Sequence, residues 1–177
     1  TILSNSIGTT NLLQIMCDIN WQCSALLVTS DKCYENIEKS TGYKETDKLG
    51  GKDIYSSSKA AAEIFINSYI YSYKKEIITV RGNNVYGIRQ YPEKLIPRCI
   101  INLLRNKKIP IHGNGKNERF YLSAVDFAKA ITLLIKKKNK GVYNIGSNEY
   151  YSNFELAKII CKYLKKDPKK FINFVKD

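Results

Sequence analysis

The sequence predicts an α/β fold with a parallel sheet, because segments of helical periodicity alternate with short apolar segments. Apolar side chains recur at helical spacing over residues 6–20, whereas the apolar run 24–29 is too short for a buried helix and suits a buried strand. An alanine-rich segment predicts the next helix over 55–73. The apolar segment 76–81 predicts a second buried strand, so helices and parallel strands follow one another in this half of the chain.

Helices and strands also alternate in the later half, in shorter segments. They are, in order, a helix over 95–106, a strand edge and turn over 109–115, a helix over 126–136, a strand over 141–146 and a helix over 154–164. Asn153 is the expected cap of the last helix, and Asp167 and Pro168 are its expected end. Residues 82–87 are too rich in glycine and asparagine to continue a sheet.

A long loop is expected over residues 35–54, which contain three glycines and many charged side chains. Its length exceeds that of ordinary connections between elements. We therefore expect a functional loop, such as one that covers a substrate.

Composition favours a globular protein without a membrane span. The 177 residues are 44% hydrophobic, which is enough for an ordinary core, and no apolar run approaches the length of a membrane helix. The first residues lack the basic and apolar regions of a secretory signal. The five cysteines are odd in number, scattered and never in a C-x-x-C pair, so we expect no disulfide framework and no metal site. We expect a soluble, cytoplasmic protein.

The formal net charge of +13 raises the question of a nucleic-acid partner, because basic surfaces attract phosphate. The lysines cluster, however, where helix ends and loops are predicted, and there they complement helix dipoles and keep the surface solvated. The clusters are 107–108, 136–138, 165–166 and 169–170. No predicted helix pairs these lysines with a strong apolar face, so we expect neither nucleic acid nor a membrane as a partner.

Tyr55 and Lys59 form the first candidate catalytic pair. Their spacing on the predicted helix places the phenol and the ammonium on one face. A nearby cation favours the phenolate, which can act as a base toward a sugar hydroxyl, while Lys59 also reaches a cofactor ribose. Such pairs also occur as plain amphipathic surface features, so the pair alone identifies no activity.

Thr29, Ser30, Asp31 and Lys32 form the second candidate site, where the predicted strand 24–29 ends. Ligands bind at the carboxyl ends of strands in open α/β sheets. The same residues could also be a polar strand end that caps the next turn. Together and in this order, the two motifs are far more specific than either alone.

The order of three motifs resembles the extended short-chain dehydrogenases. The motifs are Thr-Ser-Asp-Lys-Cys-Tyr at 29–34, Tyr-x-x-x-Lys at 55–59 and Arg-Gly-Asn-Asn-Val-Tyr-Gly at 81–87. The finer resemblance is to nucleotide-sugar 4,6-dehydratases. Residues 28–63 resemble CDP-glucose enzymes, whereas the chain from Arg81 onward resembles UDP-glucose and dTDP-glucose enzymes, which leaves the nucleobase open.

The resemblance implies a Rossmann-like parallel sheet that is incomplete at its N-terminus, with part of a smaller substrate-binding domain. The sequence has no glycine-rich turn of the G-x-G-x-x-G type, so we expect the first βαβ units to lie upstream. Residues 1–90 are expected to be the C-terminal part of the NAD-binding domain and to carry the catalytic residues. Residues 91–177 are expected to be a substrate-binding portion interleaved with remaining Rossmann elements. The resemblance also implies a homodimer, in which the helices over 6–20 and 55–73 pair across a two-fold axis.

The implied reaction is the NAD-dependent dehydration of an NDP-glucose to the 4-keto-6-deoxy sugar. Tyr55 would take the proton of the 4-hydroxyl as the C4 hydride passes to NAD, and Ser30 would hydrogen-bond the 4-oxygen. Asp31, held protonated, would protonate the departing 6-hydroxyl, Lys32 would remove the C5 proton, and the hydride would return to C6. Lys32 must then be neutral part of the time, which desolvation and the cation Lys59 would favour.

The resemblance also implies a set of binding residues. The implied NAD contacts are Thr29, Ser30, Tyr55, Lys59 and Asn83, and the implied substrate contacts are Asn84, Lys94, Leu95, His112 and Arg119. Asn84, Lys94 and Arg119 match positions that hold the substrate diphosphate, which suits amide and cationic side chains. His112, the only histidine, is expected to line the nucleotide site and not to act as a catalyst.

Two other interpretations stay open. A 4-epimerase or decarboxylase of the same family would use Tyr55 and Lys59 without an elimination, but such enzymes lack an acid and base pair like Asp31 and Lys32. A non-catalytic remnant would bind polyanions or a partner protein in a salt-sensitive way and would not respond to nucleotide sugars.

Overall fold

The computed structural model describes residues 1–19, 22–37 and 41–176. These residues form two compact units, the first made of Thr1–Asn83 and Ala128–Ile145, and the second of Asn84–Phe127 and Gly146–Asp177. Asn20, the predicted end of the first helix, and residues 38–40 of the predicted loop lie outside the described residues.

The first unit is built on a parallel sheet, as the sequence predicts. Its strands are β1 (Ser24–Val28), β2 (Glu76–Gly82) and β6 (Gly141–Ile145), in the order β1-β2-β6. Val28 pairs with Val80, and Val80 pairs with Tyr143, so the carboxyl ends of all three strands meet at one edge. The central strand β2 is buried at every position after its first residue. The α/β class with a parallel sheet is therefore confirmed.

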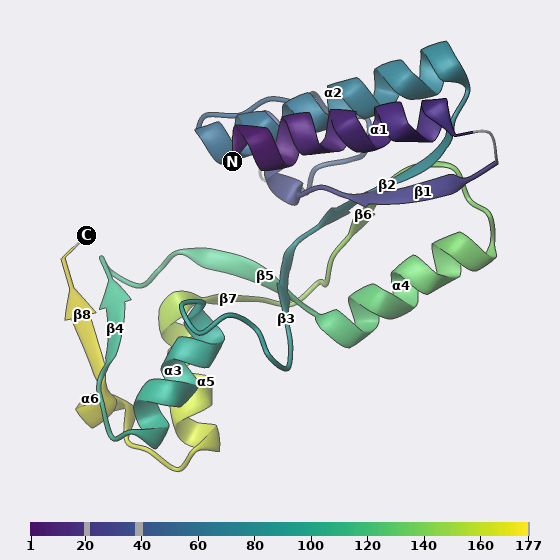
Figure 1. The fold of residues 1–177 in the computed structure, drawn as a ribbon. Helices are drawn as coiled ribbons and strands as arrows, with labels where there is room; N and C mark the ends of the chain where they lie inside the picture. Colours follow the sequence, from purple (N-terminus) through teal and green to yellow (C-terminus); the bar gives the residue numbers. More distant parts are fainter. Residues whose placement is uncertain (20–21, 38–40, 177) are drawn as a thin grey trace. The chain divides into compact units, whose positions relative to one another are not determined.

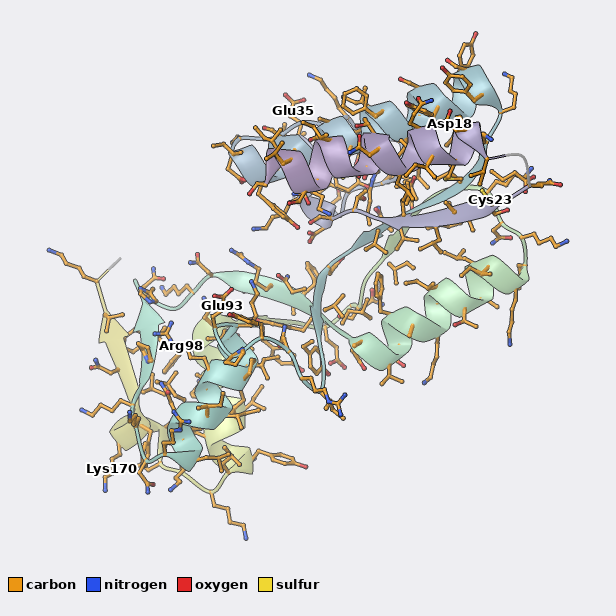
Figure 2. All side chains as sticks on the ribbon, viewed as in Figure 1. Asp18, Cys23, Glu35, Glu93, Arg98 and Lys170 are labelled. Carbon is orange, nitrogen blue, oxygen red and sulfur yellow. The ribbon has the colours of Figure 1, made fainter. Side chains whose placement is uncertain are left out.

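Two helices lie side by side on one face of this sheet (Figure 1). The first begins with a π-helical turn, Leu3–Ile7, and continues as α1 (Gly8–Asp18), whereas α2 spans Ile54–Tyr73. Their shared core with β2 consists of Leu13, Met16, Ile66 and Ile77. Figure 2 labels Asp18, the last residue of α1, and Cys23, which directly precedes β1.

Helix α4 (Ala124–Lys136) contributes residues to both units. Its larger part, from Ala128 on, belongs to the first unit and leads into β6. In Figure 1 this helix lies on the side of the sheet opposite α1 and α2. Helices thus cover both faces of the central strand, which explains why β2 is buried at nearly every position.

The second unit packs helices α3 (Leu95–Leu104) and α5 (Asn153–Tyr163) around one core. The fully buried members of that core are Cys99, Leu103, Ile109, Ile111, Ala157 and Cys161. Beside them, β4 (Ile109–His112) pairs in parallel with β8 (Ile172–Val175), which follows the short helix α6 (Pro168–Phe171). A further sheet has the order β3-β5-β7, with β3 (Asn84–Tyr86), β5 (Glu118–Ser123) and β7 (Tyr150–Ser152).

The expectation that residues 82–87 do not continue a sheet is wrong in part. The chain leaves the sheet of β2 after Gly82, but Asn84–Tyr86 form a strand of another sheet. β2 continues to Gly82, and β3 forms at Asn84–Tyr86 in parallel register with β5. Val85 and Tyr86 have good strand propensity. The Asn84 side chain also donates a hydrogen bond to the Phe120 carbonyl (3.0 Å), so the asparagine supports the strand pair instead of starting a turn.

The last helices begin differently from the prediction. Ser152, not Asn153, caps α5, because Ser152 and Glu155 form a reciprocal capping box. Helix α5 already ends at Tyr163, and Asp167 caps the next helix, α6, with Pro168 at its first position. Proline is well suited to that position because its missing N–H would have no partner there.

The sequence analysis does not predict the strands β5, β7 and β8.

No helix in the described ranges is long and apolar enough to cross a membrane. All five cysteines are free thiols, and Cys33, Cys99 and Cys161 are buried.

Candidate active site

The second candidate motif lies at the carboxyl edge of the first unit's sheet. The Thr29 amide donates to the Val80 carbonyl (2.8 Å), so the residue after β1 still follows the sheet register. The chain then turns into a short 3-10 helix, Asp31–Cys33. The Ser30 hydroxyl accepts from the Lys32 amide (3.2 Å) and donates to the Asp31 carboxylate (3.1 Å). The motif is therefore held where ligands bind in open α/β sheets, and Ser30 also caps its turn.

The first candidate pair lies in the opening turns of α2. Asp53 caps this helix by accepting from the Ser56 amide (2.9 Å), and its pKa is lowered mainly by that hydrogen bond, with the Lys32 charge contributing. Tyr55 and Lys59 follow one turn apart. The Tyr55 side chain is 43% exposed and Lys59 is half-buried. The phenol therefore remains accessible to a ligand.

The structure brings the two motifs together. The 3-10 helix packs against α2, and Cys33 and Tyr34 share a buried cluster with Ala60, one residue beyond Lys59. Asp31 is half-buried at this junction. Two segments that are separate in sequence thus supply a carboxylate, two amines, a phenol and a hydroxyl to one region of the first unit.

Lys32 differs from the expectation in one respect. The sequence interpretation requires desolvation to favour its neutral form, but the Lys32 side chain is exposed. Lys32 lies in the middle of the 3-10 helix Asp31–Cys33. Within the described part of the chain, burial therefore does not help Lys32 to act as a base.

A buried ion pair lies beneath these residues and is not predicted from the sequence. Glu63 and Arg81 are 1% and 3% exposed. The Arg81 Nε donates to both carboxylate oxygens of Glu63 (3.0 Å each), and Nη2 donates to the same carboxylate. The Thr29 hydroxyl donates to Glu63 as well (2.6 Å). The carboxylate is thus bonded from both β1 and β2, which compensates for much of the cost of burying it.

Tyr34 and Asn144 extend this pair to the third strand. Arg81 Nη1 donates to the Tyr34 hydroxyl (2.6 Å), and that hydroxyl donates to Asn144 Oδ1 (2.6 Å). The Arg81 guanidinium also lies 4.5 Å from the centre of the Tyr34 ring. Thr29, Tyr34, Glu63, Arg81 and Asn144 form what we call the buried polar cluster.

The electrostatics of the cluster follow from burial and pairing. Burial alone would lower the pKa of Arg81, but its hydrogen bonds to Glu63 and Tyr34 outweigh burial and raise that pKa. Burial raises the pKa of Tyr34, although Arg81 opposes this effect. Burial and the Glu63 charge raise the pKa of the Cys33 thiol, which therefore stays protonated. These groups keep one protonation state and are unsuited to proton transfer.

Two features of the sequence could have indicated this cluster. Glu63 lies four residues after Lys59, so Tyr55, Lys59 and Glu63 follow one another along the same face of α2. Arg81 stands near the end of a predicted buried strand, directly after the apolar Val80. A charged residue in such a strand requires a partner of opposite charge.

The remaining predicted NAD contact, Asn83, follows β2 at the same edge of the sheet. Its amide donates to the Ile145 carbonyl (3.3 Å), so it lies between the ends of β2 and β6. With Thr29 and Ser30 after β1, the predicted cofactor residues are distributed over the ends of adjacent strands.

The predicted substrate residues belong to the second unit. Asn84 on β3 and Arg119 on β5 are on paired strands, and Arg119 is exposed. Lys94 directly precedes α3 and is exposed, whereas Leu95 is half-buried against the core. His112 is exposed at the end of β4. The structure thus brings Asn84 and Arg119 to neighbouring strands and leaves the other three on separate elements of this unit.

The chain is similar to several known proteins. The family model described as GDP-mannose 4,6 dehydratase matches residues 1–175. The chain is 37% identical over 177 residues to a trifunctional UDP-glucose 4,6-dehydratase, 3,5-epimerase and reductase of Arabidopsis thaliana, covering 98% of this chain and 26% of that protein. It is 44% identical over 138 residues to dTDP-D-glucose 4,6-dehydratase of Dictyostelium discoideum, covering 77% and 31%.

A solved structure matches almost the whole chain. This is the dTDP-glucose 4,6-dehydratase of Bacillus anthracis in complex with NAD, with a TM-score of 0.90 and 37% identity. The match covers 99% of this chain and 56% of the other. The chain therefore spans between about a quarter and just over half of the length of these relatives.

Proposed function

The chain belongs to the GDP-mannose 4,6-dehydratase family, and we propose that it carries the catalytic residues of an NAD-dependent nucleotide-sugar 4,6-dehydratase. The observation that supports this most is the junction between the 3-10 helix with Ser30, Asp31 and Lys32 and the first turns of α2 with Tyr55 and Lys59. The proposed reaction converts an NDP-glucose, with cytosine, uracil or thymine as its base, into the NDP-4-keto-6-deoxy sugar. The names of the two curated relatives include this activity.

Tyr55 is the proposed base for the first step. Its exposed phenol accepts the proton of the 4-hydroxyl, and Lys59 lies one turn away on the same helix. Ser30, which is buried and already oriented by its own turn, hydrogen-bonds the 4-oxygen. The result is a 4-keto sugar, in which the carbonyl acidifies the hydrogen at C5.

Asp31 and Lys32 are the proposed acid and base of the elimination. The protonated Asp31 donates its proton to the departing 6-hydroxyl, and Lys32 takes the C5 proton. Lys32 is exposed in the described structure, so the bound substrate and cofactor must supply the desolvation that favours its neutral amine. Epimerases and decarboxylases of this family need no such pair, which is why the dehydratase is preferred.

The polar residues at the strand ends suit the nicotinamide-ribose portion of NAD. Lys59 provides a cation for ribose hydroxyls, and Thr29 and Asn83 provide polar groups after β1 and β2. When bound, NAD supplies the hydride acceptor for C4 and the hydride donor for C6. The pyrophosphate needs a glycine-rich turn, and the 177-residue sequence contains none.

In the second unit, Asn84, Lys94 and Arg119 are the proposed contacts of the substrate diphosphate. Lys94 and Arg119 are exposed cations, and such groups pair well with phosphate oxygens. Leu95 and His112 are the proposed contacts of the nucleoside.

We also propose a cytoplasmic location, which agrees with five free thiols.

We further propose a homodimer formed through the layer of α1 and α2. These adjacent helices expose large apolar side chains, among them Leu12, Ile15, Ile64 and Phe65, which are 41–56% exposed. Covering such a face in an isologous interface removes apolar surface from water. Ile64→Glu should convert the full-length dimer to a monomer in sedimentation, whereas Leu133→Glu, at an exposed apolar position of α4, should not. A parent protein that is monomeric at all concentrations would contradict the proposal.

The proposed activity is tested with full-length protein, NAD and each of CDP-, UDP- and dTDP-glucose. Mass spectrometry should find a product lighter by one water with one of the three sugars, and NMR should identify it as the 4-keto-6-deoxy compound. Conversion to the 4-epimer without loss of water would contradict the dehydratase. Absence of turnover with all three sugars would contradict the function altogether.

A further inference from the structure

We propose that the buried polar cluster anchors the loop over residues 41–53 and thereby positions Tyr55 relative to Ser30, Asp31 and Lys32. Arg81 and Tyr34 are thus positioning residues that touch neither substrate nor cofactor. This inference rests on the proposed function, because it assigns the cluster a role in the same site.

The loop is fixed to the cluster at Tyr43 and Glu45. Arg81 Nη1 donates to the Glu45 carbonyl (3.1 Å), and the Asn144 amide donates to the Glu45 carboxylate (2.8 Å). The Asn144 side chain donates to the Tyr43 carbonyl (2.9 Å). The Tyr43 ring also stacks on Tyr34, with ring centres 4.9 Å apart. One guanidinium and one asparagine thus hold the middle of the loop against the ends of β2 and β6.

The other end of the loop is joined to the start of α2. Tyr34 and Leu49 form an isolated bridge, so the loop returns to the segment that follows the 3-10 helix. A Cβ at Gly51 would lie 2.3 Å from the Ser57 amide nitrogen, which shows how closely the backbone approaches the helix. Asp53 then caps α2 two residues before Tyr55. A displacement of the loop would therefore change the position of this phenol.

The same cluster holds the other half of the site. The Thr29 hydroxyl donates to Glu63, and Thr29 directly precedes Ser30. Glu63 in turn lies on α2, one turn beyond Lys59. A single buried ion pair therefore fixes the end of β1, the helix α2 and the loop with respect to one another. Fully bonded buried networks of this kind are rigid.

Tyr34→Phe is the most informative test, because it removes only the hydroxyl that joins Arg81 to Asn144 and keeps the aromatic ring. Leaving buried groups without a partner should speed hydrogen exchange of the amides in residues 41–53 by about tenfold. In the full-length enzyme, kcat should fall by about tenfold while KM for the nucleotide sugar stays within about twofold. Exchange and turnover are measured at a temperature at which circular dichroism shows that the parent and the variant are both folded.

Tyr143→Phe is the matched control. Its hydroxyl donates to the Lys140 carbonyl (2.9 Å) in the same unit but outside the cluster, so exchange and kcat should both stay at parent values. Glu45→Ala provides a second test if Tyr34→Phe does not fold, because Glu45 is exposed and the substitution removes one of the two hydrogen bonds that Asn144 makes to the loop. It should produce the same changes in smaller degree.

The outcomes separate the parts of the proposal. Unchanged exchange over 41–53 in both variants would overturn the anchoring role. Faster exchange with unchanged kcat would overturn the positioning of Tyr55. If the parent protein turns over none of the three nucleotide sugars, the proposed function fails, whereas the exchange experiment still decides whether the cluster holds the loop.

Discussion

Two groups of polar residues in the candidate site differ in exposure and bonding. We call Lys32, Tyr55 and Lys59 the rim of the site, and we compare the rim with the buried polar cluster. On α2, Tyr55 is 43% exposed, Lys59 is half-buried and Glu63 is 1% exposed. Lys32 and Arg81 show the same contrast, because Lys32 is exposed and Arg81 is buried. Side chains that exchange protons must be accessible and able to change charge, whereas those that support them need a constant charge and several bonds. In the proposed mechanism the accessible polar groups react, and the buried ones support them.

The largest effect on activity should come from the rim. Tyr55→Phe removes the proposed base for the 4-hydroxyl, so kcat should fall by about 10²- to 10⁴-fold, the usual contribution of a general base. The free energy of unfolding should stay near the parent value, because the exposed hydroxyl supports no core contact. Turnover assays and urea denaturation measure the two quantities. Tyr143→Phe should retain full activity, and a Tyr55→Phe enzyme of parent activity would remove Tyr55 from the mechanism.

The largest effect on stability should come from the cluster. Arg81→Ala leaves Glu63 as a buried carboxylate without its cation, and breaking a buried pair in this way costs about 3–5 kcal/mol of unfolding free energy. Urea denaturation of the chain measures the loss. Lys48→Ala breaks the exposed pair with Glu35 and should change stability little. Equal effects of the two substitutions would contradict the distinction between rim and support.

Lys32→Ala should affect one step of the reaction and not the fold. Tyr55 and Lys59 remain, so oxidation at C4 should proceed, but the C5 proton should have no nearby acceptor. Reduced nicotinamide should accumulate on the full-length enzyme while the 4-keto-6-deoxy product forms at least about 100-fold more slowly. Absorbance of the nicotinamide and analysis of the product distinguish the steps. Turnover at the parent rate would mean that another group removes the C5 proton.

The smallest effect should come from Asp53, which links loop and helix at the border of the two regions. Its pKa in the folded protein is lower than the ordinary value of 3.8, chiefly because it accepts from the Ser56 amide. Its contribution to stability is therefore fully present above pH 3.8 and should be lost as the pH falls through the lower folded-state pKa. Asp53→Asn keeps a capping side chain but should remove this acid dependence. Thermal unfolding between pH 2 and 5 would reveal it, in comparison with the parent.

The sequence by itself determined the elements of the first unit and the residues of the rim. Periodicity located α1, short apolar runs located β1 and β2, and an alanine-rich segment located α2, because all of these signals are local in sequence. The Tyr55 and Lys59 pair was predictable because helical spacing is a local property. In the second unit, β3, β5, β7 and β8 were missed, since short strands depend on their partners more than on their own residues.

Only the tertiary structure decided which polar residues are exposed and which are buried and paired. Glu63 and Arg81 are 18 residues apart, and Tyr34 and Asn144 are 110 apart, so no local pattern pairs them. The parallel register of β2 and β6 places Arg81 beside Asn144, and the packing of α2 against β2 brings Glu63 to Arg81. The exposure of Lys32 was likewise decided by the turn after β1. Residue types reveal which groups can carry charge, whereas burial and long-range partners determine which of them stay charged and fixed.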